Sequence, residues 1–409
     1  MPSSIFLRLT ISCLASLFVS CVLGLEAPAP QSGEEGLTPL ERLGKRVFED
    51  KALSRPAGVS CASCHDAAAA FQGVNGSPVP AVARGALPTS LGKRNTPTIM
   101  YASFAPPFGF VDDKDEKTGK VERVPAGGQF LDGRANDLLA QFEGPLLDPL
   151  EMNAPSKRFA VETIRDGDYA PLARNVYGDK VFDNPDTAFE KLAQAVVAYE
   201  SSARFHPFAS KFDDYLRGKA RLTPLEQKGF ALFKDEKKGN CIACHVGKTG
   251  SRKPQDWLFT DYTYDALGAP KNLAIAATAS APDLGLCKRP NLDKVVPAGF
   301  DVASVCGAFK VPTLRNVAVT APYLHNGVFA TLRDVVAFYA TRDTDPAHWF
   351  PKDANGKLEK FNDLPADARS NVNTDEVPYD RKKGQKPRLS EKDVNALVAF
   401  LETLTDRPN

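Results

Sequence analysis

Apolar side chains recur at helical spacing near the end of each half of this chain. Residues 189–199 read FEKLAQAVVAY, and the apolar run that follows Ser390 has the same period of three to four residues. Alternating apolar and polar residues, which would indicate strands, are scarce. The pattern therefore predicts a mainly α fold, with the segments 105–128 and 250–310, rich in proline, glycine and charge, as long loops.

A repeated motif marks the beginning of each half. The sequence LTPLE at residues 37–41 recurs at residues 222–226, and each copy is followed by glycine, phenylalanine, aspartate and a CxxCH motif. Threonine caps a helix whose first turn carries proline and glutamate, so each copy predicts a helix that leads into the CxxCH loop. We therefore expect two domains of the same design, 26–210 and 211–409.

The N-terminal residues have the pattern of an export signal. Arg8 precedes an apolar run over residues 9–25, and a polar, proline-containing stretch follows. This pattern predicts that residues 1–25 are a signal peptide and that the mature protein is periplasmic. A transmembrane anchor is disfavoured because the run is short and interrupted by serines. Lipid attachment through Cys21 remains an alternative.

Composition and cysteine use add two expectations. The formal net charge of +1 gives no reason to expect nucleic acid as a partner. Of the eight cysteines, two lie in the expected signal peptide and four in the CxxCH motifs, which leaves Cys287 and Cys306. In an oxidising compartment such a remaining pair favours a disulfide, although the sequence does not give the distance between the two residues.

The two CxxCH motifs carry the most specific chemistry, and their residues are Cys61, Cys64 and His65 in the first copy and Cys241, Cys244 and His245 in the second. The two thiols add to the vinyl groups of haem, and the histidine ligates the iron. A zinc site would need further paired ligands, and a redox dithiol does not need the histidine. The motifs therefore predict two covalently bound haems c, in cytochrome c-like domains with the haems near the domain interface.

The second axial position of each iron separates an enzyme from an electron carrier. The chain has only three methionines, all in its first half, and no histidine between His65 and His206. At least one haem therefore lacks a strong second ligand from its own domain, as in haem enzymes. The alternative is a non-enzymatic dihaem electron-transfer cytochrome, in which a distant histidine folds back as the ligand: His206, His325 or His348.

Six short motifs lie in a fixed order around the CxxCH pair: RNTPT at 94–98, DGR at 132–134, QFEGPLLDPLEM at 141–152, FDDYLRG at 212–218, KVPTLRN at 310–316 and TAPYLHNG at 320–327. In this order they resemble the bacterial dihaem cytochrome c peroxidase and MauG family over nearly the whole mature chain. The resemblance implies that the first haem reacts with hydrogen peroxide and that the second relays electrons. It also implies a calcium ion between the haems, held by the Asn95 side chain and the carbonyls of Thr320 and Pro322, oxygen ligands that suit a hard cation. Asn95 could instead be a simple turn residue.

The resemblance also places Gln141, Pro145 and Glu151 on the open side of the first haem. Cleavage of a peroxide needs a carboxylate that takes a proton from the inner oxygen and delivers it to the outer one. Glu151 lies in an apolar stretch and suits this role if burial raises its pKa towards neutral. The alternative is that Glu151 caps or pairs on a helix surface.

Three departures from the family pattern change the expectation. The loop 66–93 has no histidine, so the first haem resembles those of members in which it is permanently open. Tyr339 stands where the family has the methionine ligand of the second haem, although the helical pattern of 332–339 would equally make it a core aromatic residue. Leu131 replaces the tryptophan between the haems, and leucine cannot carry an electron hole.

Together these features predict a periplasmic dihaem peroxidase that reduces hydrogen peroxide with electrons from a small cytochrome c or a cupredoxin. Gln141 and Glu151 are the expected catalytic residues, and Tyr339 is the expected second ligand of the second haem. The alternative within the family is a MauG-like enzyme that oxidises residues of a partner protein via high-valent iron. A homodimer is compatible with both.

Overall fold

The computed structural model describes residues 33–114, 119–276 and 281–407. The expected signal peptide, including Cys21, lies outside the described residues. Within the described part of the chain, no helix is both long enough and apolar enough to cross a membrane.

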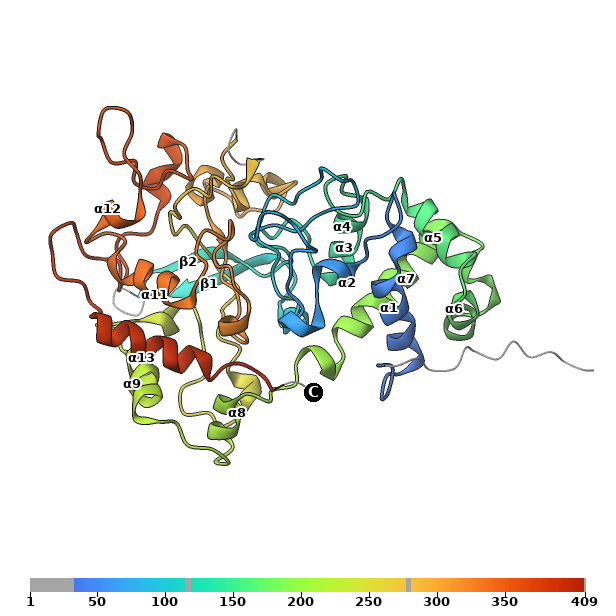
Figure 1. Ribbon diagram of the computed structural model, residues 1–409, viewed down its shortest axis with the longest axis horizontal. Helices are drawn as coiled ribbons and strands as arrows, with labels where there is room; N and C mark the ends of the chain where they lie inside the picture. Colours follow the sequence, from blue (N-terminus) through green and yellow to red (C-terminus); the bar gives the residue numbers. More distant parts are fainter. Residues whose placement is uncertain (1–32, 115–118, 277–280, 408–409) are drawn as a thin grey trace, which may run out of the picture.

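The fold is mainly helical, as the hydrophobic pattern predicts (Figure 1). The helices of the first half are α1 (Pro39–Glu49), α2 (Cys61–Cys64), α3 (Leu138–Gln141), α4 (Glu143–Leu147), α5 (Lys157–Arg165), α6 (Ala170–Tyr177) and α7 (Pro185–Glu200). Those of the second half are α8 (Lys211–Leu216), α9 (Pro224–Lys234), α11 (Leu332–Thr341), α12 (Pro346–Trp349) and α13 (Glu391–Glu402). In Figure 1 the two groups lie on opposite sides of the molecule, joined through the chain that leads from α7 to α8.

The repeated motif forms the same helix pair in both halves. Thr38 and Thr223 cap α1 and α9 with capping boxes, as the sequence predicts. Helix α1 packs on α7, and α9 packs on α13. A Cβ atom at Gly44 would lie 1.9 Å from the carbonyl oxygen of Ala195, and one at Gly229 would lie 1.9 Å from that of Ala396. The glycine of each repeat therefore permits two helix backbones to touch.

Two large hydrophobic cores correspond to the two helix pairs. The buried residues of the first lie between Leu43 and Phe208, and those of the second between Phe212 and Leu404. The domain boundary that we place at residue 210 lies between these two sets.

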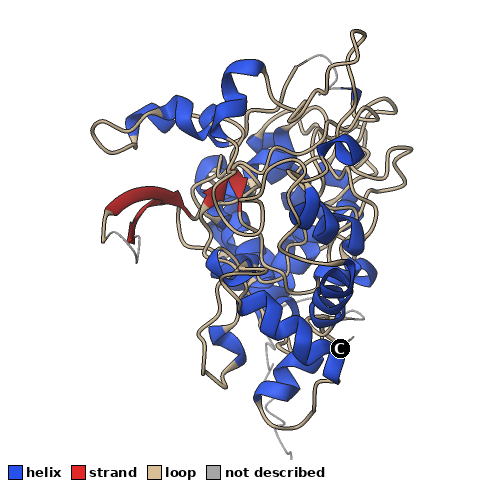
Figure 2. Cartoon of the chain, turned by 90° about the vertical axis from the view of Figure 1, so that its left-hand side faces the viewer, coloured by secondary structure: helices blue, strands red, loops and turns tan. Residues whose placement is uncertain are grey.

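The segment 105–128 corrects one expectation, because it forms a β-hairpin where the sequence predicts a loop. Strands β1 (Gly109–Lys114) and β2 (Val121–Ala126) pair antiparallel, with Gly109 opposite Ala126. The hairpin projects from the body of the molecule (Figure 2). Its outer residues face solvent on both sides, so the apolar alternation by which strands are recognised is absent.

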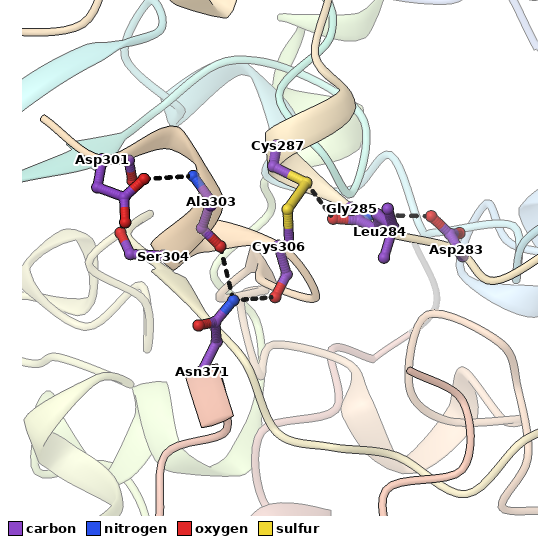
Figure 3. Close-up of a disulfide and its surroundings, with 9 residues drawn as sticks. All are labelled: Asp283, Leu284, Gly285, Cys287, Asp301, Ala303, Ser304, Cys306 and Asn371. Atoms are coloured by element: carbon purple, nitrogen blue, oxygen red, sulfur yellow. Dashed lines mark hydrogen bonds between the residues drawn. A yellow bond between two sulfur atoms is a disulfide. The ribbon is translucent and has the colours of Figure 1, made fainter. Parts of the chain in front are cut away.

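The segment 250–310 is mostly loop, as expected, and a disulfide joins Cys287 to Cys306 within it (Figure 3). The segment also contains two short strands, β3 (Tyr264–Asp265) and β4 (Phe309–Lys310), which pair antiparallel. Asn371 donates hydrogen bonds from Nδ2 to the carbonyl oxygens of Ala303 and Cys306, at 2.7 and 3.1 Å. The expected disulfide is confirmed. The two bonds from Asn371 tie the backbone beside Cys306 to a later part of the second half.

Candidate active site

One large cavity contains all the residues that the sequence predicts to act on haem. Its volume is about 830 Å³, and both CxxCH motifs line it. Because its walls come from both halves, the two motifs share one interior space.

The first CxxCH motif is held by short-range contacts at the end of helix α1. Ser60 and Ser63 form a capping box at the start of α2, which carries both cysteines. His65 donates a hydrogen bond from Nδ1 to the carbonyl oxygen of Phe71, at 3.0 Å. This bond fixes the tautomer and leaves Nε2 as a free electron-pair donor.

The second motif repeats this arrangement. His245 donates from Nδ1 to the carbonyl oxygen of Phe259, at 3.1 Å, and burial lowers the pKa of its imidazole to about 4. Within the described residues, none of the four cysteines of the two motifs forms a disulfide. Each motif thus offers two thiols and one neutral imidazole nitrogen to the cavity, which is the donor set that haem c needs.

Gln141 and Glu151 line the same cavity as the first motif. Gln141 ends α3, whose first turn is capped by Asp137. Burial, with a smaller contribution from Asp148, raises the pKa of Glu151 to about 6, while Arg134 opposes the shift. A carboxyl group with this pKa can accept and release a proton near neutral pH.

Backbone contacts hold Glu151 against the loop that follows the first CxxCH motif. The Ala86 amide donates to the Glu151 carbonyl oxygen at 2.7 Å, and the Glu151 amide donates to that of Asp148 at 3.0 Å. A Cβ atom at Gly85 would lie 2.1 Å from the Leu150 carbonyl oxygen. The close approach of these two segments therefore depends on glycine.

Tyr339 lies on α11 and lines the cavity near the second motif. Burial raises the pKa of its phenol well above the usual value, and the charges of Asp265, Cys244 and Cys241 add to the effect. Its ring centre lies 6.1 Å from that of Tyr379. The tyrosine thus lines the shared cavity near the second motif, and its role as an iron ligand stays a prediction.

The residues of the expected calcium site lie on one wall of the cavity. Asn95 donates from Nδ2 to the carbonyl oxygens of Pro322 and Leu324, at 2.6 and 3.2 Å, and Thr320 lines the same cavity. Among the described residues, no group of three or more histidine, cysteine, aspartate or glutamate side chains could hold a metal ion. A calcium ion here would therefore depend on amide and carbonyl oxygens, and the site stays a prediction.

Sequence reasoning missed several carboxyl groups in the cavity, and Glu200 is the one beside the first motif. Glu200, the last residue of α7, is only 7% exposed, and burial raises its pKa to about 8. It is the charged group with the largest effect on the Cys61 thiol. Because glutamates at helix ends are usually solvated, no local pattern distinguishes this one.

Known proteins resemble this chain over most of its length. A family model described as di-haem cytochrome c peroxidase matches residues 39–221. The methylamine utilization protein MauG of Paracoccus denitrificans is 36% identical over 408 residues, which is 98% of this chain and 96% of that protein. The cytochrome c peroxidase of Escherichia coli is 30% identical over 320 residues, 75% of this chain and 56% of that protein. The crystal structure of the diheme peroxidase BthA from Burkholderia thailandensis superposes with a TM-score of 0.81 at 40% identity, covering 90% of this chain and 86% of that one.

Proposed function

Because this chain belongs to the di-haem cytochrome c peroxidase family and is a haem oxidoreductase, we propose that it is a periplasmic enzyme that reduces hydrogen peroxide at its first haem. The observation that carries this proposal is Glu151, a carboxyl group with a pKa near 6 in the same cavity as Cys61, Cys64 and His65. The loop 66–93 has no histidine that could close the first iron.

Each residue of the first site has a distinct task in this proposal. A haem held by Cys61, Cys64 and His65 would supply the redox-active iron. Glu151, in its ionised form, takes the proton from the inner peroxide oxygen and returns it to the outer one, which leaves as water. Gln141 orients the peroxide through its amide group. The bond from His65 to Phe71 holds the imidazole in the orientation that iron ligation requires.

Reduction of one hydrogen peroxide to two waters consumes two electrons and two protons. The electrons enter from a small cytochrome c or a cupredoxin and reach the first site through the second. Leu131 lines the cavity that both motifs share and cannot be oxidised, so transfer between the two sites is direct tunnelling or uses an aromatic residue.

A second candidate function is favoured by Tyr339 and by the similarity to MauG over almost its full length. In this alternative the electrons come from residues of a partner protein rather than from a small redox protein. A phenolate ligand stabilises oxidised iron and so disfavours reduction by a high-potential donor. Leu131 weighs against this alternative because it stands where the family has a tryptophan, and leucine cannot carry an electron hole.

The electron paramagnetic resonance spectrum of the oxidised, haem-loaded protein tests the proposal. We expect a high-spin ferric signal from the first haem that disappears on addition of hydrogen peroxide. Two low-spin signals and no reaction with peroxide would instead identify an electron-transfer cytochrome. Turnover with a reduced small cytochrome c, compared with turnover in its absence, then separates the peroxidase from the enzyme that modifies a partner.

A further inference from the structure

The two halves share one helix arrangement, with α1 packed on α7 and α9 packed on α13 (Figure 1). In each pair the glycine of the repeat lies against the same two positions, which aligns α7 with α13: Ala195 and Tyr199 in the first half, Ala396 and Phe400 in the second. The residues that follow, Glu200 and Leu401, are therefore equivalent, and both line the cavity. The first half thus has a carboxyl group where the second has an apolar side chain.

Glu200 lies beside the first CxxCH motif without a polar partner. It is 7% exposed, and no described residue forms a hydrogen bond or an ion pair with its side chain. Burial raises the pKa of the Cys61 thiol, and Glu200 is the next-largest cause. At Cys241, the equivalent cysteine, burial raises the pKa and no charged group contributes. The charge of Glu200 therefore acts at the first motif and has no counterpart at Cys241.

The charged groups around α7 interact with one another rather than with Glu200. Helices α1 and α5 pack on α7, and their charged side chains form the ion pairs Lys45–Glu49, Arg46–Glu34 and Arg158–Glu162. Arg204 donates to the Gly33 carbonyl oxygen at 3.0 Å. The titratable groups that Glu200 does affect, Cys61 and Tyr199, are neutral at neutral pH, because burial raises the pKa of each.

Burial is also the cause of the raised pKa of Glu200, about 8. The C-terminal end of a helix, where Glu200 lies, disfavours an anion further. The side chain is therefore mostly protonated at neutral pH. An ionised carboxylate in a buried cavity disfavours the addition of an electron to a nearby haem, and a neutral carboxyl group does not.

We propose that Glu200 couples reduction of the first haem to the uptake of one proton. When an external donor adds one electron to the ferric iron, the Glu200 carboxylate takes one proton from solvent, and reoxidation of the iron releases it. The inference rests on the proposed function and adds to it a second proton-holding group at the first site, besides Glu151.

The midpoint potentials of the two haems test this coupling in the haem-loaded protein, followed by electron paramagnetic resonance without peroxide. In the wild type, we expect the potential of the first haem to fall as the pH rises through about 8, because the carboxylate then accumulates. Glu200→Gln should abolish this fall. A dependence centred near pH 6 would belong to Glu151 and should remain. Glu190→Gln is the matched control, since Glu190 is exposed on α7 and does not line the cavity.

Leu401→Glu moves the carboxyl group to the second half. The potential of the second haem should then fall with pH more steeply than in the wild type. If this variant does not fold, Glu200→Leu, which copies the arrangement of the second half, should abolish the fall at the first haem as Glu200→Gln does.

A fall near pH 8 that persists in Glu200→Gln, or that Glu190→Gln abolishes equally, would overturn the inference. An unchanged second potential in folded, haem-loaded Leu401→Glu would overturn it too. Absence of any reaction with peroxide would overturn the proposed function instead, and the potentials would still decide the role of Glu200 because they are measured without peroxide.

Discussion

At the scale of single residues, Glu151 has the two properties that peroxide cleavage requires: a place beside the first motif and a pKa raised to about 6. The carboxylate is the active form, so the rate of reaction with peroxide should rise with pH through about 6 and remain constant above it. We expect Glu151→Gln to lower this rate by about 10²–10⁴ and to abolish its dependence on pH. Stopped-flow absorbance measures both effects.

Glu143 provides the control for this prediction. It lies on α4 close to Glu151 in sequence, but its side chain is 45% exposed and pairs with Lys157. Glu143→Gln should therefore keep the wild-type rate and pH profile. If Glu151→Gln kept the same profile, proton transfer would have to be assigned to another group.

Tyr339 is the residue whose role is most directly visible in a spectrum. Burial keeps its phenol protonated, and only a strong cation such as ferric iron would make the phenolate the favoured form. Tyr339→Phe should remove the phenolate-to-iron charge-transfer band and raise the reduction potential of the second haem.

Tyr379 is a matched control, because it lies beside Tyr339 and its hydroxyl donates to Asp265 at 3.3 Å. Tyr379→Phe should leave the charge-transfer band in place. A band that survives in Tyr339→Phe would show that the tyrosine is only a packed aromatic residue.

Residue roles were predictable where the chemistry is local in sequence. The CxxCH motifs need only adjacent residues, and the motif around Glu151 identifies its position. Glu200 could not be found in this way, because its burial arises only in the folded chain, where it lines the cavity with Cys61 and other residues distant in sequence. Burial of a polar side chain is a property of the packed molecule.

At the scale of elements, the contact between helices α1 and α7 and that between α9 and α13 depend on one glycine each. We expect Gly44→Ala and Gly229→Ala to lower the free energy of unfolding by about 1–3 kcal/mol each, because the added methyl group forces the helix backbones apart. Denaturant unfolding of the haem-loaded protein measures the change. Gly109→Ala is the control, since nothing lies within 4 Å of its added Cβ; an equal loss there would contradict the explanation.

The elements also show which parts of the fold could be predicted. Thr38 and Thr223 specify helix starts by contacts within one turn, so local sequence is sufficient. The hairpin was missed because its strands are stabilised by pairing with each other and by a small cluster at the base, around Phe108 and Leu286. Neither strand has an apolar face of its own.

At the scale of the whole molecule, Arg315 connects the two halves. Its guanidinium donates to both carboxylate oxygens of Asp213, at 3.0 and 2.9 Å, and both side chains are fully buried. The same group lies 4.9 Å from the ring centre of Tyr101 and 4.5 Å from that of Phe208. Asp213 belongs to α8, whereas Tyr101 and Phe208 belong to the first core. The cation therefore contacts both halves.

Loss of one partner of this pair should be costly. Arg315→Met leaves the Asp213 carboxylate buried without its cation, and we expect a loss of about 3–5 kcal/mol in the free energy of unfolding. The double variant Arg315→Met/Asp213→Leu should recover part of this loss. Thermal or denaturant unfolding measures both.

The ion pair of Lys228 and Asp393 gives the comparison, because its lysine side chain is 46% exposed, unlike that of Arg315. Lys228→Met should cost at most about 1 kcal/mol. Equal effects at the two sites would mean that burial of the Arg315 pair is unimportant.

The resemblance identified the motifs that hold Arg315 and Asp213, but not their pairing, because no local rule joins segments so far apart in the chain.

The cysteines of this molecule have two chemical fates. Among the described residues, Cys287 and Cys306 form a disulfide, whereas the sulfurs of the CxxCH motifs form none and line the cavity. Haem attachment consumes thiols, and a disulfide within a CxxC pair would withdraw them from that reaction. Haem attachment therefore requires that the CxxCH sulfurs be reduced when haem arrives. A host that oxidises thiols quickly but attaches haem slowly will yield blocked chains.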